Sequence, residues 1–62
     1  MAEYEKKVRE ELSKNGWAFH HHGKGDHDIW VKDDLKVTVD GKIYSRHTAN
    51  GIMKRAGIDK HW

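Results

Sequence analysis

The sequence predicts an α+β fold in which two helices cover one face of a three-stranded antiparallel sheet, in the order α-β-β-β-α. Two observations point to it: apolar residues recur at helical spacing near both ends of the chain, and short apolar segments separated by turn residues lie between them. Three consecutive strands with two amphipathic helices pack most simply as a sheet with both helices on one side. At 62 residues, the chain is expected to form a single domain over residues 1–62.

The first helix is predicted over residues 2–15. Tyr4, Val8 and Leu12 recur every four residues and therefore form one apolar stripe. Gly16 follows the pattern and is expected to end the helix.

Two short strands are predicted next. Trp17–Phe19 is aromatic and runs into a polar stretch ending in Gly23–Gly25, which indicates a strand followed by a flexible loop. Ile29–Val31 is the second apolar segment, and the tight turn Lys32–Asp34 follows it.

The third strand is predicted over residues 35–40. Leu35, Val37 and Val39 alternate with polar residues, so all three are expected on a buried face. Because the preceding turn is short, this strand and the second one should form a hairpin.

The second helix is predicted to begin after Ser45, a good N-cap residue. Its apolar positions follow helical spacing, and Gly57 is expected to stop it, with Ile58 folding back on the last turn. The apolar positions are Ala49, Ile52, Met53 and Ala56.

Composition narrows the choice of partners. The chain has no cysteine, no apolar run near the roughly 18 residues that span a bilayer and no signal-peptide pattern, so we expect a soluble, cytoplasmic protein without membrane contact. The net charge is +2, but residues 36–62 carry +4. This excess is compatible with phosphate contacts, although a solvated lysine face is the commoner explanation.

Three consecutive histidines, His20–His22, invite a metal-site interpretation, since imidazole is a common metal ligand. Strand geometry argues against it, because neighbouring side chains on a strand point to opposite faces and His21 should not join His20 and His22. We therefore expect no metal and no cofactor, and interpret these residues as polar side chains at a strand end.

The segment Gly23–Asp28 is the most function-like stretch. Glycines allow a tight turn with exposed N–H groups that cradle phosphate, Lys24 adds charge, and His27 can transfer a proton near neutral pH. The alternative is structural: His27 shares a strand side with Ile29 and Val31, which would make it a histidine near the core.

Four segments of the chain together resemble the HicA toxin family of bacterial toxin–antitoxin systems. They are KNGW at 14–17, GKGDHDIW at 23–30, VTV at 37–39 and SRHTANGIMKRAGI at 45–58. The resemblance implies a fold like that of double-stranded-RNA-binding domains. It also implies an mRNA-cleaving ribonuclease that a HicB antitoxin inhibits, with His27 as the essential catalytic residue. Many members have Ser at the position of Asp26 and Pro at that of Asp40, so this chain is more acidic there.

RNA cleavage needs only proton transfer and charge stabilisation, because the 2′-OH of RNA is the nucleophile. His27 could act as general base or general acid but not as both in one turnover. The complementary group is left open among Asp26, Asp28, a neighbouring histidine and water. The expected RNA contacts are Lys24, Gly25, Arg46 and Lys54.

The expected partners are mRNA and a HicB-like antitoxin, and no DNA is expected for the chain by itself. The main alternative is a non-catalytic RNA-binding module, because the same fold binds duplex RNA by shape. A metal-binding or purely protein-binding domain is the third possibility.

Overall fold

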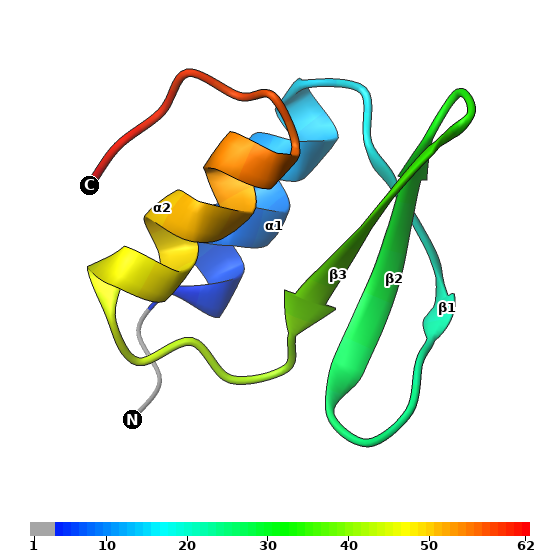
Figure 1. The fold of residues 1–62 in the computed structure, drawn as a ribbon, viewed down its shortest axis with the longest axis horizontal. Helices are drawn as coiled ribbons and strands as arrows, with labels where there is room; N and C mark the ends of the chain where they lie inside the picture. Colours follow the sequence, from blue (N-terminus) through cyan, green and yellow to red (C-terminus); the bar gives the residue numbers. More distant parts are fainter. Residues whose placement is uncertain (1–3) are drawn as a thin grey trace.

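The structure, a computed structural model, describes residues 4–62 and has the predicted architecture. Both helices lie on one side of a three-stranded antiparallel sheet of order β1-β2-β3 (Figure 1). The predicted fold class is thereby confirmed. No helix in this part of the chain is long and apolar enough to cross a membrane. The elements are α1 (Glu5–Lys14), β1 (Ala18–His22), β2 (His27–Lys32), β3 (Leu35–Asp40) and α2 (Arg46–Arg55).

The first helix, α1, buries Val8 and Leu12, as the four-residue spacing predicts. Of the predicted range 2–15, residues 2 and 3 lie outside the described residues. Gly16 ends the helix with φ of +88°, a conformation that glycine adopts at little cost. The chain then turns back, and the backbone N–H of Trp17 donates to the carbonyl of Leu12 at 2.9 Å.

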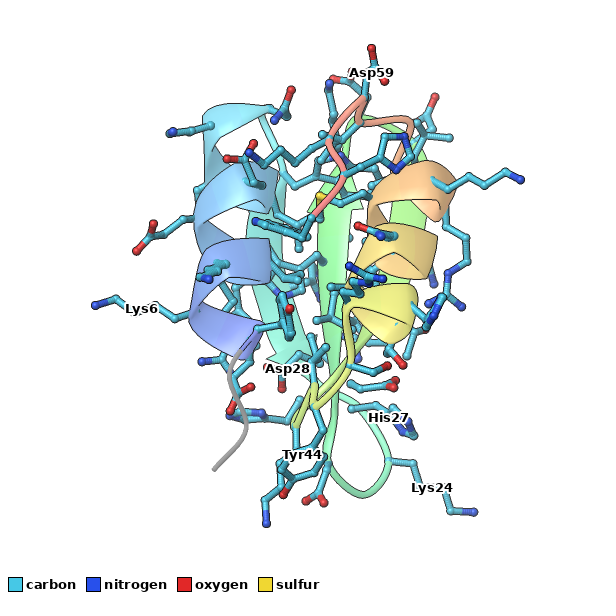
Figure 2. The ribbon with its side chains drawn as sticks, turned by 90° about the vertical axis from the view of Figure 1, so that its left-hand side faces the viewer. Lys6, Lys24, His27, Asp28, Tyr44 and Asp59 are labelled. Carbon is cyan, nitrogen blue, oxygen red and sulfur yellow. The ribbon has the colours of Figure 1, made fainter. Side chains whose placement is uncertain are left out.

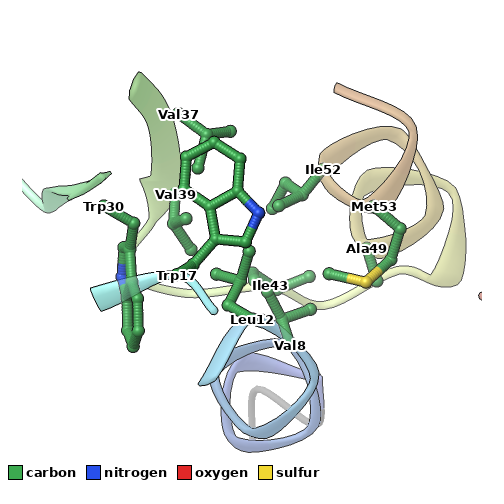
Figure 3. Packing of buried hydrophobic residues seen from close by; sticks show 10 residues of the cluster. All are labelled: Val8, Leu12, Trp17, Trp30, Val37, Val39, Ile43, Ala49, Ile52 and Met53. Carbon is green, nitrogen blue, oxygen red and sulfur yellow. The ribbon is translucent and has the colours of Figure 1, made fainter. Parts of the chain in front are cut away.

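A single apolar core fills the space between the helices and the sheet (Figure 3). It draws on both helices, on β2 and β3, and on two residues outside regular elements. Its buried members are Val8, Leu12, Trp17, Trp30, Val37, Val39, Ile43, Ala49, Ile52 and Met53.

The prediction for Leu35 is wrong, because 60% of the residue is exposed. Leu35 pairs with Lys32 directly beside the two-residue turn between β2 and β3. That turn projects past the part of the sheet that the helices cover (Figure 1). Alternation along β3 therefore assigns the right face to Leu35, but no helix reaches far enough to bury it.

Strand β1 is longer than predicted and includes the three histidines. Its pairing with β2 shifts between Phe19 and His21, which makes His20 the extra residue of a β-bulge. Every residue of β1 is exposed. Backbone hydrogen bonds to β2 hold the strand. Because neither face of it is buried, its sequence has no alternation of apolar and polar residues.

Strand β2 places His27 on the open face of the sheet. A structural role would require His27 to lie on the face that the helices cover. Asp28 and Trp30 are buried, whereas His27 is exposed and Ile29 and Val31 are only half-buried. The large indole of Trp30 occupies the core side, so alternation places His27 on the open face. The interpretation of His27 as a core histidine is wrong.

The second helix is confirmed at both ends. The Ser45 hydroxyl accepts a hydrogen bond from the Thr48 N–H at 3.2 Å, as an N-cap does. Gly57 has φ of +70°, and the Ile58 N–H donates to the Met53 carbonyl at 2.9 Å, which closes the helix. The terminal Trp62, for which the sequence predicts no role, packs edge-on against the Tyr4 ring and is half-buried.

Candidate functional site

The candidate site lies at one end of the sheet, around the four-residue loop Gly23–Asp26 between β1 and β2. The segment that leads from β3 into α2 lies at the same end, and the β2–β3 turn lies at the other (Figure 1). This segment touches the loop, because a Cβ at Gly41 would overlap the backbone oxygen of Asp26. Glycine at position 41 thus lets the two loops approach closely.

His27 begins β2 at the edge of this loop, with about half of its side chain exposed. Its Nδ1 lies 3.2 Å from the backbone oxygen of Lys24, and a carbonyl only accepts, so Nδ1 carries a hydrogen and donates. Its Nε2 lies 3.4 Å from a carboxylate oxygen of Asp40, the residue opposite it on β3. Both ring nitrogens therefore face oxygen acceptors, which together fix the orientation of the ring.

A second histidine at the same end is held by a buried carboxylate. His22 Nδ1 lies 2.7 Å from an Asp28 oxygen, across the pairing of β1 with β2. Asp28 is only 8% exposed, whereas the His22 side chain is 82% exposed. Arg9 of α1 lies 4.0 Å from the other Asp28 oxygen. Because the carboxylate accepts, the hydrogen of a neutral His22 sits on Nδ1, and Nε2 is left with its lone pair.

The pair of His22 and Asp28 forms part of the wall of a polar cavity of about 220 Å³. The cavity lies between α1, the β1–β2 loop and the segment after β3, and its lining carries charges of both signs. The lining residues are Arg9, His22, Gly25, Asp26, Asp28, Gly41 and Lys42.

His20 and His21 of the three consecutive histidines do not alternate as predicted. The bulge at His20 brings its ring onto that of His21, with centroids 4.8 Å apart and Nδ1 atoms in contact. The expectation that neighbouring side chains here point to opposite faces is wrong for this pair, because a bulge interrupts the alternation. Within residues 4–62, no three His, Cys, Asp or Glu side chains gather in an arrangement that could hold a metal ion.

The structure brings some of the predicted RNA contacts together. The Lys24 side chain extends outward beside His27 (Figure 2), and Gly25 lines the cavity with φ of +69°. Arg46 is the first residue of α2, at the end of the segment that touches the loop. Lys54 lies two turns further along α2, roughly 12 Å from Arg46, so it does not join the group at the loop.

Sequence reasoning did not identify the partners that fix the two histidines. The sequence marks Asp40 only as a departure from the family pattern and Asp28 only as one of several acidic residues near His27. A hairpin register centred on Gly25 would have paired His22 with Asp28. No sequence signal links Arg9 to this end of the sheet, since its contact depends on how α1 packs.

Comparison with known proteins identifies a family. A family model described as the HicA toxin of bacterial toxin–antitoxin matches residues 6–58, which is most of the chain. Neither the curated proteins nor the solved structures gave a match.

Proposed function

Because the chain belongs to the HicA toxin family and is thus the toxin of a toxin–antitoxin system, we propose that it is a ribonuclease that cleaves mRNA in the cytoplasm. Family membership implies an antitoxin partner, which we propose to be of the HicB type.

The observation that carries the proposal is the setting of His27. Its imidazole is exposed at the edge of a glycine loop, outside the apolar core, and two acceptors orient it. A histidine that served only the core would be buried. An oriented and accessible imidazole is what proton transfer to a bound substrate requires.

We assign His27 the role of general acid. With Nδ1 donating to the Lys24 carbonyl, the proton on Nε2 is the one available for transfer. The Asp40 carboxylate lies 3.4 Å from Nε2 and helps to orient the ring for this transfer. Attack of the 2′-OH on phosphorus expels the 5′ oxygen, and His27 supplies the proton that this oxygen needs as it leaves.

The RNA backbone is proposed to cross the end of the sheet beside the loop. Lys24 and Arg46 would contact phosphates there, and the N–H groups around Gly25 offer further donors. Lys54 would contact the strand only where it continues along α2.

The test is cleavage of a defined RNA by the purified protein, with EDTA present and the product ends identified. Internal attack by the 2′-OH leaves a 2′,3′-cyclic or 3′ phosphate on the upstream product and needs no metal, whereas a metal-activated water usually leaves a 3′-OH. RNA binding without cleavage would instead support the non-catalytic module. Loss of activity in EDTA with recovery on adding zinc would revive a metal site at the histidines.

The antitoxin is proposed to cover the loop around His27, because an exposed active loop must be blocked to silence the enzyme. Co-expression with a HicB-like partner should give a complex with a higher Tm than the toxin alone, since binding stabilises the folded state. A partner footprint confined to the exposed side of α1, with His27 open, would contradict this placement.

A further inference from the structure

One imidazole cannot both take the proton from the 2′-OH and give one to the leaving oxygen in the same turnover. The proposed ribonuclease therefore needs a second proton-transfer group near the loop. The inference below rests on the proposed function and identifies that group.

We propose that His22 is the general base of the reaction and that Asp28 is its positioning residue. Asp28 is buried and accepts a hydrogen bond of 2.7 Å from His22 Nδ1. A buried carboxylate that holds Nδ1–H fixes the tautomer in which Nε2 has a free lone pair. The ring itself is 82% exposed, so its Nε2 is accessible to substrate.

A purely structural role explains this pair less well. Ion pairs at the surface contribute little to stability. The His22 side chain is 82% exposed, and its ring meets Phe19 only edge-on, with centroids 5.2 Å apart, so it buries little apolar surface. Burial of Asp28 carries a desolvation cost that Arg9, at 4.0 Å, offsets only in part. The cost is understandable if the carboxylate is kept there to orient the imidazole.

The cavity supplies room beside this base. Its volume of about 220 Å³ leaves space for a polar group of a substrate. The charged groups around His22 are Arg9 from α1, Asp28 from β2, and Asp26 and Lys42 from the two loops. The cations Arg9 and Lys42 can face a phosphate that approaches the loop, while the Asp28 carboxylate stays against His22 and Arg9.

The two histidines flank the loop from opposite faces of the sheet. His22 shares the helix side with Asp28, and His27 lies on the open face opposite Asp40. In-line displacement requires the attacking and leaving oxygens on opposite sides of phosphorus. An RNA strand that crosses the loop tip would place the base on one side and the acid on the other.

The step balances with these two groups. The 2′-OH proton passes to His22 Nε2 as the bond from the 2′ oxygen to phosphorus forms. The bond from phosphorus to the 5′ oxygen breaks, and that oxygen takes the Nε2 proton of His27. The products are a 2′,3′-cyclic phosphate and a 5′-OH, and both rings regain their starting states by exchanging protons with water.

The experiment uses two RNA substrates that differ only in the scissile 5′ atom, oxygen or sulfur. A thiolate leaves without a proton, so it bypasses the acid but not the base. Cleavage of the oxygen substrate by His27→Ala should be about 100-fold or more slower than by the unchanged protein, and the sulfur substrate should restore most of this loss of rate. His22→Gln should cleave both substrates more slowly by a similar factor. His20→Gln and His21→Gln are the matched controls and should cleave both normally.

The pH profile gives a second readout. A base acts when deprotonated, so activity of the normal protein should rise with pH on the acidic side, and His22→Gln should lose this limb while keeping the alkaline fall due to His27. Asp28→Asn should also lose cleavage, because the amide NH₂ donates to Nδ1 and moves the ring hydrogen to Nε2.

The outcomes separate this inference from the proposed function. Normal cleavage by His22→Gln, while His27→Ala is inactive, would overturn the role of His22 and leave the ribonuclease intact. Absence of cleavage by the unchanged protein would overturn both. Should Asp28→Asn fail to fold, the two substrates with His22→Gln still decide the role of His22.

Discussion

Strand β2 takes part in two hairpins that are built differently. With β3 it pairs without interruption from Lys32 opposite Leu35 to His27 opposite Asp40, and a turn of two residues joins the strands. With β1 it pairs across a bulge, and a loop of four residues joins the strands. The same strand therefore has a regular hairpin on one side and an irregular one on the other.

The difference distinguishes a hairpin that packs the core from one that borders the candidate site. The regular hairpin contributes Val37 and Val39 to the core, and at its end Asp40 faces His27. In the irregular hairpin β1 is wholly exposed, and its loop is flanked by His22 and by His27, which also faces Asp40 of β3. Bulges are common beside active sites because they redirect side chains. We therefore expect substitutions around the β1–β2 loop to affect cleavage more than substitutions near the β2–β3 turn.

The largest effect is expected for His27→Ala. Cleavage should fall by roughly 100-fold or more, because one proton-transfer group is lost, while Tm should stay within a few degrees, since His27 is exposed and outside the core. RNA binding and antitoxin binding should remain. Single-turnover cleavage and thermal unfolding measure the two quantities.

Thr38→Ala is the control from the regular hairpin. Thr38 is exposed on β3 opposite Ile29, and its loss should leave cleavage unchanged. A His27→Ala protein that cleaves normally ends the catalytic assignment. A variant that is inactive because it has unfolded would return His27 to a structural role.

The same contrast explains what the sequence could predict. Helix α2 has an N-cap, an apolar stripe and a C-terminal glycine, all local signals, and the structure has each of them. Apolar alternation likewise predicts the bounds of β3. Strand β1 has no such signal, because its side chains are exposed and show no apolar alternation.

The site follows the same rule. The sequence singles out His27 as a candidate by a short motif and the family resemblance, but it does not show which face of the sheet carries the ring. Its orientation depends on Trp30 occupying the core side of β2, and its Asp40 contact depends on the register with β3. The contact of His22 with Asp28 and Arg9 joins two strands and a helix, so only the folded chain shows it.

A smaller effect is expected for Gly25→Ala in the irregular loop. A Cβ there meets no atom within 4 Å, so the cost comes only from φ of +69°, which an L residue adopts at about 1–2 kcal/mol. The free energy of unfolding should fall by this amount, measured by urea denaturation. Cleavage should also fall, since the neighbouring Lys24 carbonyl orients His27.

Gly51→Ala is the matched control, because its Cβ is equally free of contacts and its helical φ suits alanine. It should raise the free energy of unfolding by roughly 0.5–1 kcal/mol. If Gly25→Ala is as stable as the unchanged protein, the loop does not depend on its left-handed glycine.

The two ends of the sheet should also differ in RNA binding. Arg46→Ala at the loop end should weaken binding similarly for different RNA sequences and lower the slope of log affinity against log salt by roughly 0.7–0.9. Lys36→Ala, close to the β2–β3 turn, should leave the slope unchanged. Equal slopes for Arg46→Ala and the unchanged protein would remove Arg46 from the interface.

The smallest effect is expected for Asp33→Gly in the regular turn. Asp33 has φ of +53°, and glycine relieves the strain of this conformation, but it also adds about 0.4–1 kcal/mol of unfolded-chain entropy. Aspartate tolerates the left-handed region better than most residues, so the strain is small and the two terms nearly cancel. The free energy of unfolding should therefore change by less than about 1 kcal/mol, and cleavage should not change, because β2 separates this turn from His27. A clear loss of cleavage with stability preserved would mean that the β2–β3 turn sets the position of His27 along the strand, and the site could no longer be assigned to the loop end of the sheet alone.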